Sequence, residues 1–164
     1  MSETLPAGDL AKVAEHERLL QFESFDEATA WELGTRIRAA AVAASAAVFI
    51  EVRLGDHCVF CSALPGTTPD NADWARRKRN LVNLLQTSSY AIALEIAAGK
   101  DALAIRGLSV RDYAPAGGCF PVRVKNSGMV GTVTVSGLPM REDHQLVVDT
   151  IATMLEVDLG DSKF

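Results

Sequence analysis

The sequence predicts one α/β domain of the α+β kind, in which helices pack on an antiparallel sheet of about five strands. Two pairs of strand-like runs carry this prediction: residues 46–53 with 57–63, and residues 119–125 with 129–136. Only three residues separate the runs of each pair, and so short a connection makes neighbouring strands antiparallel. The 164 residues are 48% hydrophobic, which is enough for one domain with a sizeable core.

Local patterns define the elements of the first part of the chain. Partial alternation at Leu20 and Phe22 predicts a strand. Asp26 is a suitable N-cap for an alanine-rich helix whose Trp31 and Ile37 allow packing on a sheet. In chain order we expect a frayed end over residues 1–9, a short helix over 10–17, a strand within 18–25, a helix over 27–43, and a hairpin of 46–53 and 57–63 turning at 54–56.

The rest of the chain begins with a well-marked helix start. Thr68 suits the N-cap and Pro69 suits the first helical position. Residues 100–116 carry no clear pattern. The other expected elements are the helix from 69 to about 86, a helix from Ser88 or Ser89 to about 99, the hairpin of 119–125 and 129–136 turning at 126–128, and a last helix from Arg141 or Glu142 with a buried stripe that ends at Leu155.

Charge and composition exclude several classes of protein. The net charge of -5 argues against nucleic acid as the main partner, because phosphate binding needs a basic face. No apolar run approaches the roughly 20 residues that span a bilayer, and residues 1–9 lack the pattern of a signal peptide. Three cysteines, an odd number, argue against a secreted disulfide framework. We therefore expect a cytoplasmic protein without nucleic-acid or membrane partners.

Cys58 and Cys61 have the C-x-x-C spacing of redox and metal sites. In a regular strand, however, positions three apart lie on opposite faces, and no second pair is present to complete a zinc site. His57 precedes the pair, whereas covalent haem attachment needs His directly after the second Cys, where Ser62 stands. We therefore expect neither a metal site nor a disulfide between Cys58 and Cys61.

A basic run from Arg76 through Arg77 and Lys78 to Arg79 follows Trp74 in the helix that begins near residue 69. Four consecutive helical residues point around most of the circumference, so they cannot all serve one site. A solvated face is one interpretation. The other is that Arg77 or Lys78 meets an anionic ligand or the carboxylates of a neighbouring subunit, with Trp74 in the core or at an interface.

Gly117 and Gly118 stand directly before a strand, where the missing Cβ lets the backbone approach a ligand or another strand closely. His144 lies in the first turn of the last helix, as a surface or capping group or as a base or ligand. The sequence has no phosphate-loop motif, no metalloprotease motif and no Ser/His/Asp signature. These residues alone therefore identify no reaction.

Six segments match one known family in order over most of the chain: residues 64–71, 74–80 and 88–90, Gly117-Gly118-x-Phe120-Pro121, residues 131–139, and Asp143-His144. On these segments, residues from about 18 to 157 resemble the haem-degrading-domain family, which includes the GlcG and HbpS proteins and the C-terminal part of PduO-type proteins. The resemblance implies a GlcG-like, profilin-like fold over residues 18–164, with residues 1–17 as an N-terminal extension or short helix. It also implies a homo-oligomer.

Some members of this family bind or degrade haem, so the resemblance implies a cytoplasmic oligomer that binds haem or another small anionic ligand. The pocket is expected between the Gly-Gly pair and the helix start at residues 70–80. Haem needs an apolar slot, cations for its propionates and an axial ligand. The candidate ligand-binding residues are Trp74, Tyr113 and Phe120 for the slot with Gly117 and Gly118 beside it, Arg77 and Lys78 for the propionates, and His144, Cys119 or Tyr113 for the iron.

One position departs from the family pattern. The branch that this chain resembles commonly has His directly before the Gly-Gly pair, and Ala116 stands there. Loss of that imidazole predicts weak haem binding and slow or absent haem breakdown. The alternative hypothesis is a non-catalytic assembly or partner-binding protein, in which the same motifs form subunit contacts.

Overall fold

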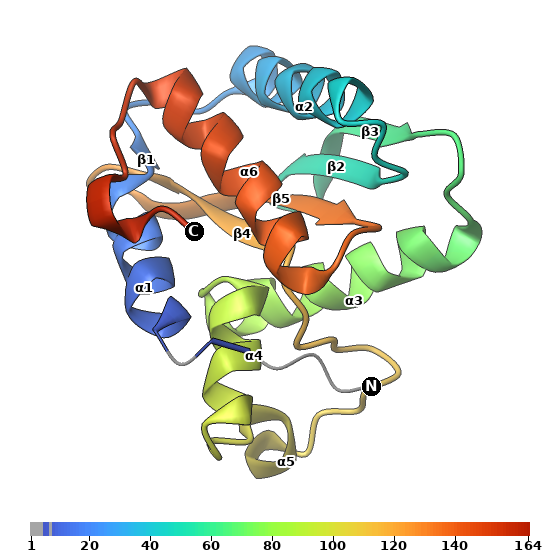
Figure 1. Ribbon diagram of the computed structural model, residues 1–164, viewed down its shortest axis with the longest axis vertical. Coiled ribbons are helices and arrows are strands. Elements are labelled where there is room, and N and C mark those ends of the chain that lie inside the picture. The colour runs from blue at the N-terminus through green and yellow to red at the C-terminus, as the bar shows by residue number, and fades with distance from the viewer. Residues whose placement is uncertain (1–4, 7) are drawn as a thin grey trace.

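The computed structural model describes residues 5, 6 and 8–164, so part of the expected frayed end lies outside the described residues. Five strands form one sheet in the order β1-β4-β5-β2-β3 (Figure 1). The strands are β1 (Gln21–Phe22), β2 (Phe49–Leu54), β3 (His57–Ala63), β4 (Cys119–Val124) and β5 (Gly128–Ser136). The helices are α1 (Asp9–Leu19), α2 (Glu27–Ala43), α3 (Pro69–Leu85), α4 (Ser89–Ala97), α5 (Ala102–Arg106), α6 (Met140–Leu155) and the 3-10 helix η1 (Gly160–Ser162).

Helices cover both faces of the sheet (Figure 1). Helices α2 and α6 lie side by side on one face, where α2 contacts β2 and β3 and α6 contacts β4 and β5. Helix α3 lies on the other face against β5, β4 and β2. Helix α1 packs on α4 and on η1, which brings the two ends of the described chain together. The predicted α/β fold, with about five strands and helices packed on the sheet, is confirmed.

The two faces of the sheet differ in chemistry. Alternate residues of β2 and β5, such as Ile50 and Val135, are buried in the apolar core that α2 and α6 complete. The residues between them, including Glu51 and Thr134, are also buried but polar, and they face α3. Arg79 of α3 reaches Glu51 and forms an ion pair with it. The main apolar core therefore lies on one face, and the other face holds buried polar groups.

The packing of α2 on the sheet depends on one small residue. Asp26 caps the helix, accepting a hydrogen bond at 2.8 Å from the backbone N–H of Thr29. One side of the helix is buried, and at Gly34 it approaches β3 so closely that a Cβ would lie 2.2 Å from Cγ of Phe60. The absence of a side chain at Gly34 is what lets the Phe60 ring lie flat under α2.

Two parts of the chain differ from the expected elements. The strand expected within 18–25 is reduced to Gln21–Phe22 because α1 continues to Leu19, and β1 pairs parallel with β4. The sheet is therefore mixed and not wholly antiparallel as expected. The sequence did not predict the parallel pairing, because a parallel pair is made through a long connection that leaves no local turn signal. The unpatterned stretch 100–116 contains the short helix α5, capped by Asp101.

A β-bulge interrupts the alternation of β3. Phe60 is paired with Val52, yet Cys58 is paired with Arg53, so Val59 is an extra residue without a partner of its own. Val59 and Phe60 are consecutive, and both pack against the apolar core.

The bulge contradicts the expectation that Cys58 and Cys61 lie on opposite faces of the strand. Cys61 is paired with Glu51 and Cys58 with Arg53, and these two partners stand two residues apart on one face of β2. Both cysteines therefore lie on that same face, because one strand residue has been inserted between them. Both side chains are exposed free thiols.

Among the described helices, none combines the length and apolar composition that a membrane crossing requires.

The contact at Gly34 predicts a clear effect on stability. Gly34→Ala is expected to lower the free energy of unfolding by about 1–3 kcal/mol, because its Cβ overlaps the Phe60 ring and forces the core to shift. The better helix propensity of alanine, about 1 kcal/mol, acts in the opposite direction. Urea unfolding measures the difference. Gly8→Ala is the control, because a Cβ there meets no atom within 4 Å, and equal midpoints for the two variants would contradict the prediction.

Candidate functional site

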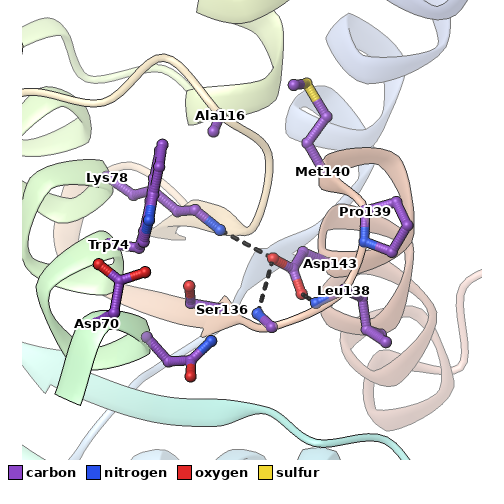
Figure 2. Close-up of a pocket in the computed structure, with 11 residues that line it drawn as sticks. Asp70, Trp74, Lys78, Ala116, Ser136, Leu138, Pro139, Met140 and Asp143 are labelled. Carbon is purple, nitrogen blue, oxygen red and sulfur yellow. Dashed lines mark hydrogen bonds and ion pairs between the residues drawn. The ribbon is translucent and has the colours of Figure 1, made fainter. Parts of the chain in front are cut away.

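A cavity of about 320 Å³ lies beside the start of α3 and the start of α6 (Figure 2). Its size is at the lower end of the range for small-molecule sites. The residues that line it come from α3, from the loop before β4, from the end of β5 and from α6: Asp70, Asn71, Trp74, Lys78, Ala116, Ser136, Gly137, Leu138, Pro139, Met140 and Asp143.

A buried ion pair forms the inner wall of the cavity. The Lys78 ammonium donates to Oδ2 of Asp143 at 2.9 Å and to the carbonyl oxygen of Val135 at 3.1 Å. The two charged side chains are 4% and 2% exposed, so both have left water almost completely. An ammonium has three N–H donors, and these two bonds leave one donor of Lys78 for a ligand in the cavity.

Asp143 also holds the chain between β5 and α6. Its carboxylate accepts hydrogen bonds from the backbone N–H of Leu138 at 2.9 Å and of Gly137 at 3.3 Å. Burial raises the pKa of the Asp143 carboxyl above its ordinary value, and the Lys78 ammonium and the two backbone N–H groups oppose this shift. The Asp143 carboxylate therefore stabilises the loop between β5 and α6 and also forms part of the cavity wall.

Gly117 and Gly118 bring their loop against this pair. A Cβ on Gly117 would lie 2.0 Å from the carbonyl oxygen of Met140. A Cβ on Gly118 would lie 2.2 Å from the carbonyl oxygen of Val135 and 2.9 Å from Nζ of Lys78, and φ at Gly118 is +122°. Both positions thus require glycine because the backbone packs closely against protein atoms. At Gly118 the neighbour is strand β5, which agrees with the expected close approach to another strand.

The basic residues of α3 pair with several different carboxylates. Arg76 pairs with Asp73 and Asp112, and Arg77 also pairs with Asp73. The Arg77 guanidinium lies 4.0 Å from the centre of the Trp74 ring, in a cation–π contact. Trp74 is 37% exposed at the edge of the cavity, and Arg77 does not line it. Lys78 is the residue of this basic run that lines the cavity.

Two helices begin at the cavity. In α3, Pro69 has no N–H and the N–H of Asn71 is bonded to the carbonyl oxygen of Thr68. In α6, the N–H groups of Glu142 and Asp143 are bonded to the carbonyl oxygen of Pro139, so the first turns keep few free N–H groups. Helix α3 contributes Asp70 and Asn71, and α6 contributes Met140, to the lining. Helix N-termini carry partial positive charge, so they favour an anionic group placed between them. The Asp70 carboxylate, exposed at the edge, limits this preference to the inner end of the cavity.

Three predicted iron ligands lie away from the cavity lining. His144 is fully buried among aromatic rings, 5.1 Å from the Tyr90 ring and 5.9 Å from Phe120. Burial raises the pKa of the Cys119 thiol to about 12, and the hydroxyl of Thr134 lies 3.1 Å from its sulfur. Tyr113 packs against a separate apolar cluster that includes Leu81. Phe120, expected in the slot, belongs to the main core.

His144 belongs instead to a buried histidine chain. Nε2 of His16 lies 2.8 Å from the carbonyl oxygen of Ser162, to which it must donate. Nδ1 of His16 is then an acceptor, so the contact of 3.2 Å to Nε2 of His144 makes His144 the donor. Nδ1 of His144 has no hydrogen-bond partner among the described residues. Burial lowers the pKa of His144 to about 3, and both imidazoles are neutral in this arrangement.

Sequence reasoning missed several residues of the cavity wall. Asp143 belongs to one of the matching motifs, but the sequence assigns no role to it or to Asn71, Ser136 and Met140. The signal for Asp143 is its place four residues after Pro139, in the first turn of α6. Its pairing with Lys78, which is 65 residues away, leaves no local trace.

The fold and the cavity together define a small profilin-like α/β domain with a ligand-sized cavity at the N-terminal ends of two helices. A family model described as "Haem degrading protein HbpS-like" matches residues 25–152. The chain therefore belongs to the HbpS-like haem-degrading protein family. A UPF0303 protein of Azotobacter vinelandii is 49% identical over 149 residues, covering 90% of both chains.

Solved structures confirm the fold. The crystal structure of Ybr137w protein matches with a TM-score of 0.82 at 24% identity, covering 94% of this chain and 90% of that one. The crystal structure of a PduOC:Heme complex matches with a TM-score of 0.64 at 14% identity, covering 80% of this chain and 94% of that one. At these identities the likeness shows a shared fold.

The buried ion pair predicts strong coupling between its two members. Lys78→Met is expected to lower the free energy of unfolding by about 3–5 kcal/mol, because the Asp143 carboxylate stays buried without its counter-ion. The double variant Lys78→Met with Asp143→Asn removes that charge, so it should be more stable than Lys78→Met alone. Urea unfolding of the single and double variants measures the coupling. Simple additivity of the two substitutions would show that the pair contributes nothing as a pair.

The histidine chain predicts acid sensitivity. The pKa of His144 is lowered to about 3 in the folded state and is ordinary, 6.5, in the unfolded state. The contribution of neutral His144 to the free energy of unfolding is therefore full above pH 6.5 and decreases as the pH falls toward 3. Between pH 7 and pH 5 it decreases by about 2 kcal/mol. Urea unfolding at both pH values compares the protein with His144→Phe, which should lose less. His57→Gln is the control on an exposed histidine, and an equal pH effect in all three proteins would refute the assignment.

Proposed function

We propose that this protein binds a small organic anion in the cavity between the starts of α3 and α6. The observation that carries the proposal is the buried Lys78 ammonium, which has one N–H donor left and lies on the cavity wall. The N-termini of two helices add to its attraction for a carboxylate or phosphate. Trp74 on the α3 side and Leu138 and Met140 on the α6 side give the ligand apolar surface in the same cavity.

Family membership supports a haem-related ligand, and the PduOC structure in complex with haem supports it from the fold. The side chains of the cavity fit the anionic part of such a ligand better than its iron. The expected donors His144, Cys119 and Tyr113 do not line the cavity, and Ala116 brings only a methyl group to its wall. The one soft donor among the lining residues is the thioether of Met140. We therefore assign recognition to the anionic group of the ligand.

Paired titrations with haem and iron-free protoporphyrin IX test this proposal, because both carry the same two propionates. We expect comparable and weak affinities for the two porphyrins, measured by absorbance and by quenching of tryptophan fluorescence. Ala116→Trp should weaken both at least tenfold by filling the cavity. The control is Ala104→Trp on α5, an exposed position outside the cavity lining, which should bind as the unmodified protein does.

Ala116→His separates anion recognition from iron ligation in the same assay. If position 116 lies beside the iron, this variant gains affinity for haem with a Soret shift but gains none for protoporphyrin IX. Equal effects of Ala116→Trp and Ala104→Trp on both porphyrins would overturn the assignment of the cavity. Tight haem binding to the unmodified protein, at least a hundredfold tighter than protoporphyrin IX, would overturn anion recognition as the dominant contact.

A second candidate function is a homo-oligomeric assembly module, with location in the cytoplasm as the sequence composition predicts. The observation that favours it is a set of exposed apolar side chains, among them Ile105 at 77%, Val110 at 70% and Trp31 at 57% exposure. Light scattering distinguishes an oligomer from a chain of 17.5 kDa. A stable oligomer that binds neither porphyrin would favour this function over the first.

A further inference from the structure

An exposed pair of thiols lies outside the cavity, on the edge strand β3. Cys58 and Cys61 are both free and exposed. They share the face of the sheet that also carries Glu51 and Arg53. Helix α3 packs on that face against β5, β4 and β2, and the two cysteine side chains on β3 stay open to solvent beyond it. Reagents in solution therefore reach both sulfurs.

The β-bulge determines the distance between the two thiols. In a regular strand, residues three apart are separated by about 10 Å and lie on opposite faces. Here the cysteines are paired with Glu51 and Arg53, which stand two residues apart, so the separation along the strand is about 6.6 Å. Disulfides join cysteines whose Cα atoms are about 4.4–6.8 Å apart. The extra residue Val59 thus brings the two Cα atoms within the range of a disulfide, and closure then requires a local movement of the edge strand that brings the Cβ atoms to about 3.5–4.5 Å.

The surroundings of the two sulfurs differ. Cys58 is paired with Arg53, whose guanidinium is held by the Glu51 carboxylate and by the carbonyl oxygen of Asp56. Cys61 is paired with Glu51, and burial followed by the neighbouring Cys58 and Glu51 raises the pKa of its thiol. Because its raised pKa keeps the Cys61 thiol protonated, Cys61 is assigned as the resolving thiol and Cys58 as the first nucleophile.

We propose that Cys58 and Cys61 form a thiol–disulfide exchange site for low-molecular-weight disulfides. The Cys58 thiolate attacks one sulfur of the disulfide, forming a mixed disulfide and releasing the first thiolate. Cys61 then attacks the sulfur of Cys58, the mixed disulfide breaks, and the second thiolate leaves. The protein loses two electrons and the two thiol protons, the small disulfide becomes two thiols, and the product is a Cys58–Cys61 disulfide.

The third cysteine provides an internal reference. Cys119 lies fully buried in β4, and burial raises the pKa of its thiol to about 12. It is therefore protonated and inaccessible under conditions in which the pair on β3 reacts. Cys119 should stay reduced until the protein is unfolded.

Mass spectrometry after incubation with oxidised glutathione and alkylation tests the proposal. The unmodified protein should lose two hydrogen atoms, with residues 58 and 61 linked and Cys119 still a thiol. Cys61→Ser should instead retain glutathione on Cys58, because no resolving thiol remains. Retention of glutathione on both cysteines of the unmodified protein, two alkylated thiols on β3, or a covalent dimer would each overturn the proposal.

A matched variant tests the geometry. Cys61→Ser combined with Ser62→Cys keeps two thiols on β3 but places the second opposite Ile50, on the core side of the sheet. This variant should accumulate mixed disulfide and form no internal link. An internal disulfide in this variant at the rate of the unmodified protein would show that local flexibility, not the bulge, brings the sulfurs together. Exchange at this site is independent of ligand binding in the cavity, so failure of either proposal leaves the other standing.

Discussion

The buried ion pair between Lys78 and Asp143 is the interaction on which the rest of the site depends. Two charges removed from water need each other and further hydrogen bonds to offset the loss of hydration. Lys78 therefore attaches α3 to the carbonyl of Val135 on β5, and Asp143 attaches α6 to the backbone of Leu138. Gly118 completes the arrangement because any side chain there would displace the ammonium. Four separate segments of the chain thus meet at one pair.

Much of the fold was predictable because its signals are local. The helix at Glu27–Ala43, the strand at His57–Ala63 and the helix start at Pro69 were all predicted at their observed bounds. Caps, turn lengths and hydrophobic spacing act within a few residues, so a sequence displays them directly. The parallel pairing of Gln21–Phe22 with β4 was missed, because it joins segments about a hundred residues apart. The bulge at Val59 was missed because one extra residue leaves the strand pattern nearly unchanged.

The sequence indicates where the candidate site lies, but not which residues contact one another there. Trp74 and Lys78 line the cavity where the motifs placed a pocket, beside the loop that carries the two glycines. The sequence leaves His144 as a surface or capping group or as a base or ligand, yet it is enclosed by aromatic rings and hydrogen-bonded to His16. Burial decides whether a titratable side chain is a ligand or a core residue, and burial is a property of the assembled fold. Asp143 was underrated for the same reason.

The difference between the two faces of the sheet has a consequence for how such domains diverge. The face under α2 and α6 carries the apolar packing, while the cavity lies beyond it, between the starts of α3 and α6, and the exposed thiols lie on the edge strand β3. Substitutions that alter ligand chemistry therefore fall on positions that contribute little to the hydrophobic core. Evolution can exchange one specificity for another while the architecture persists, as it does between this chain and solved structures only 14–24% identical.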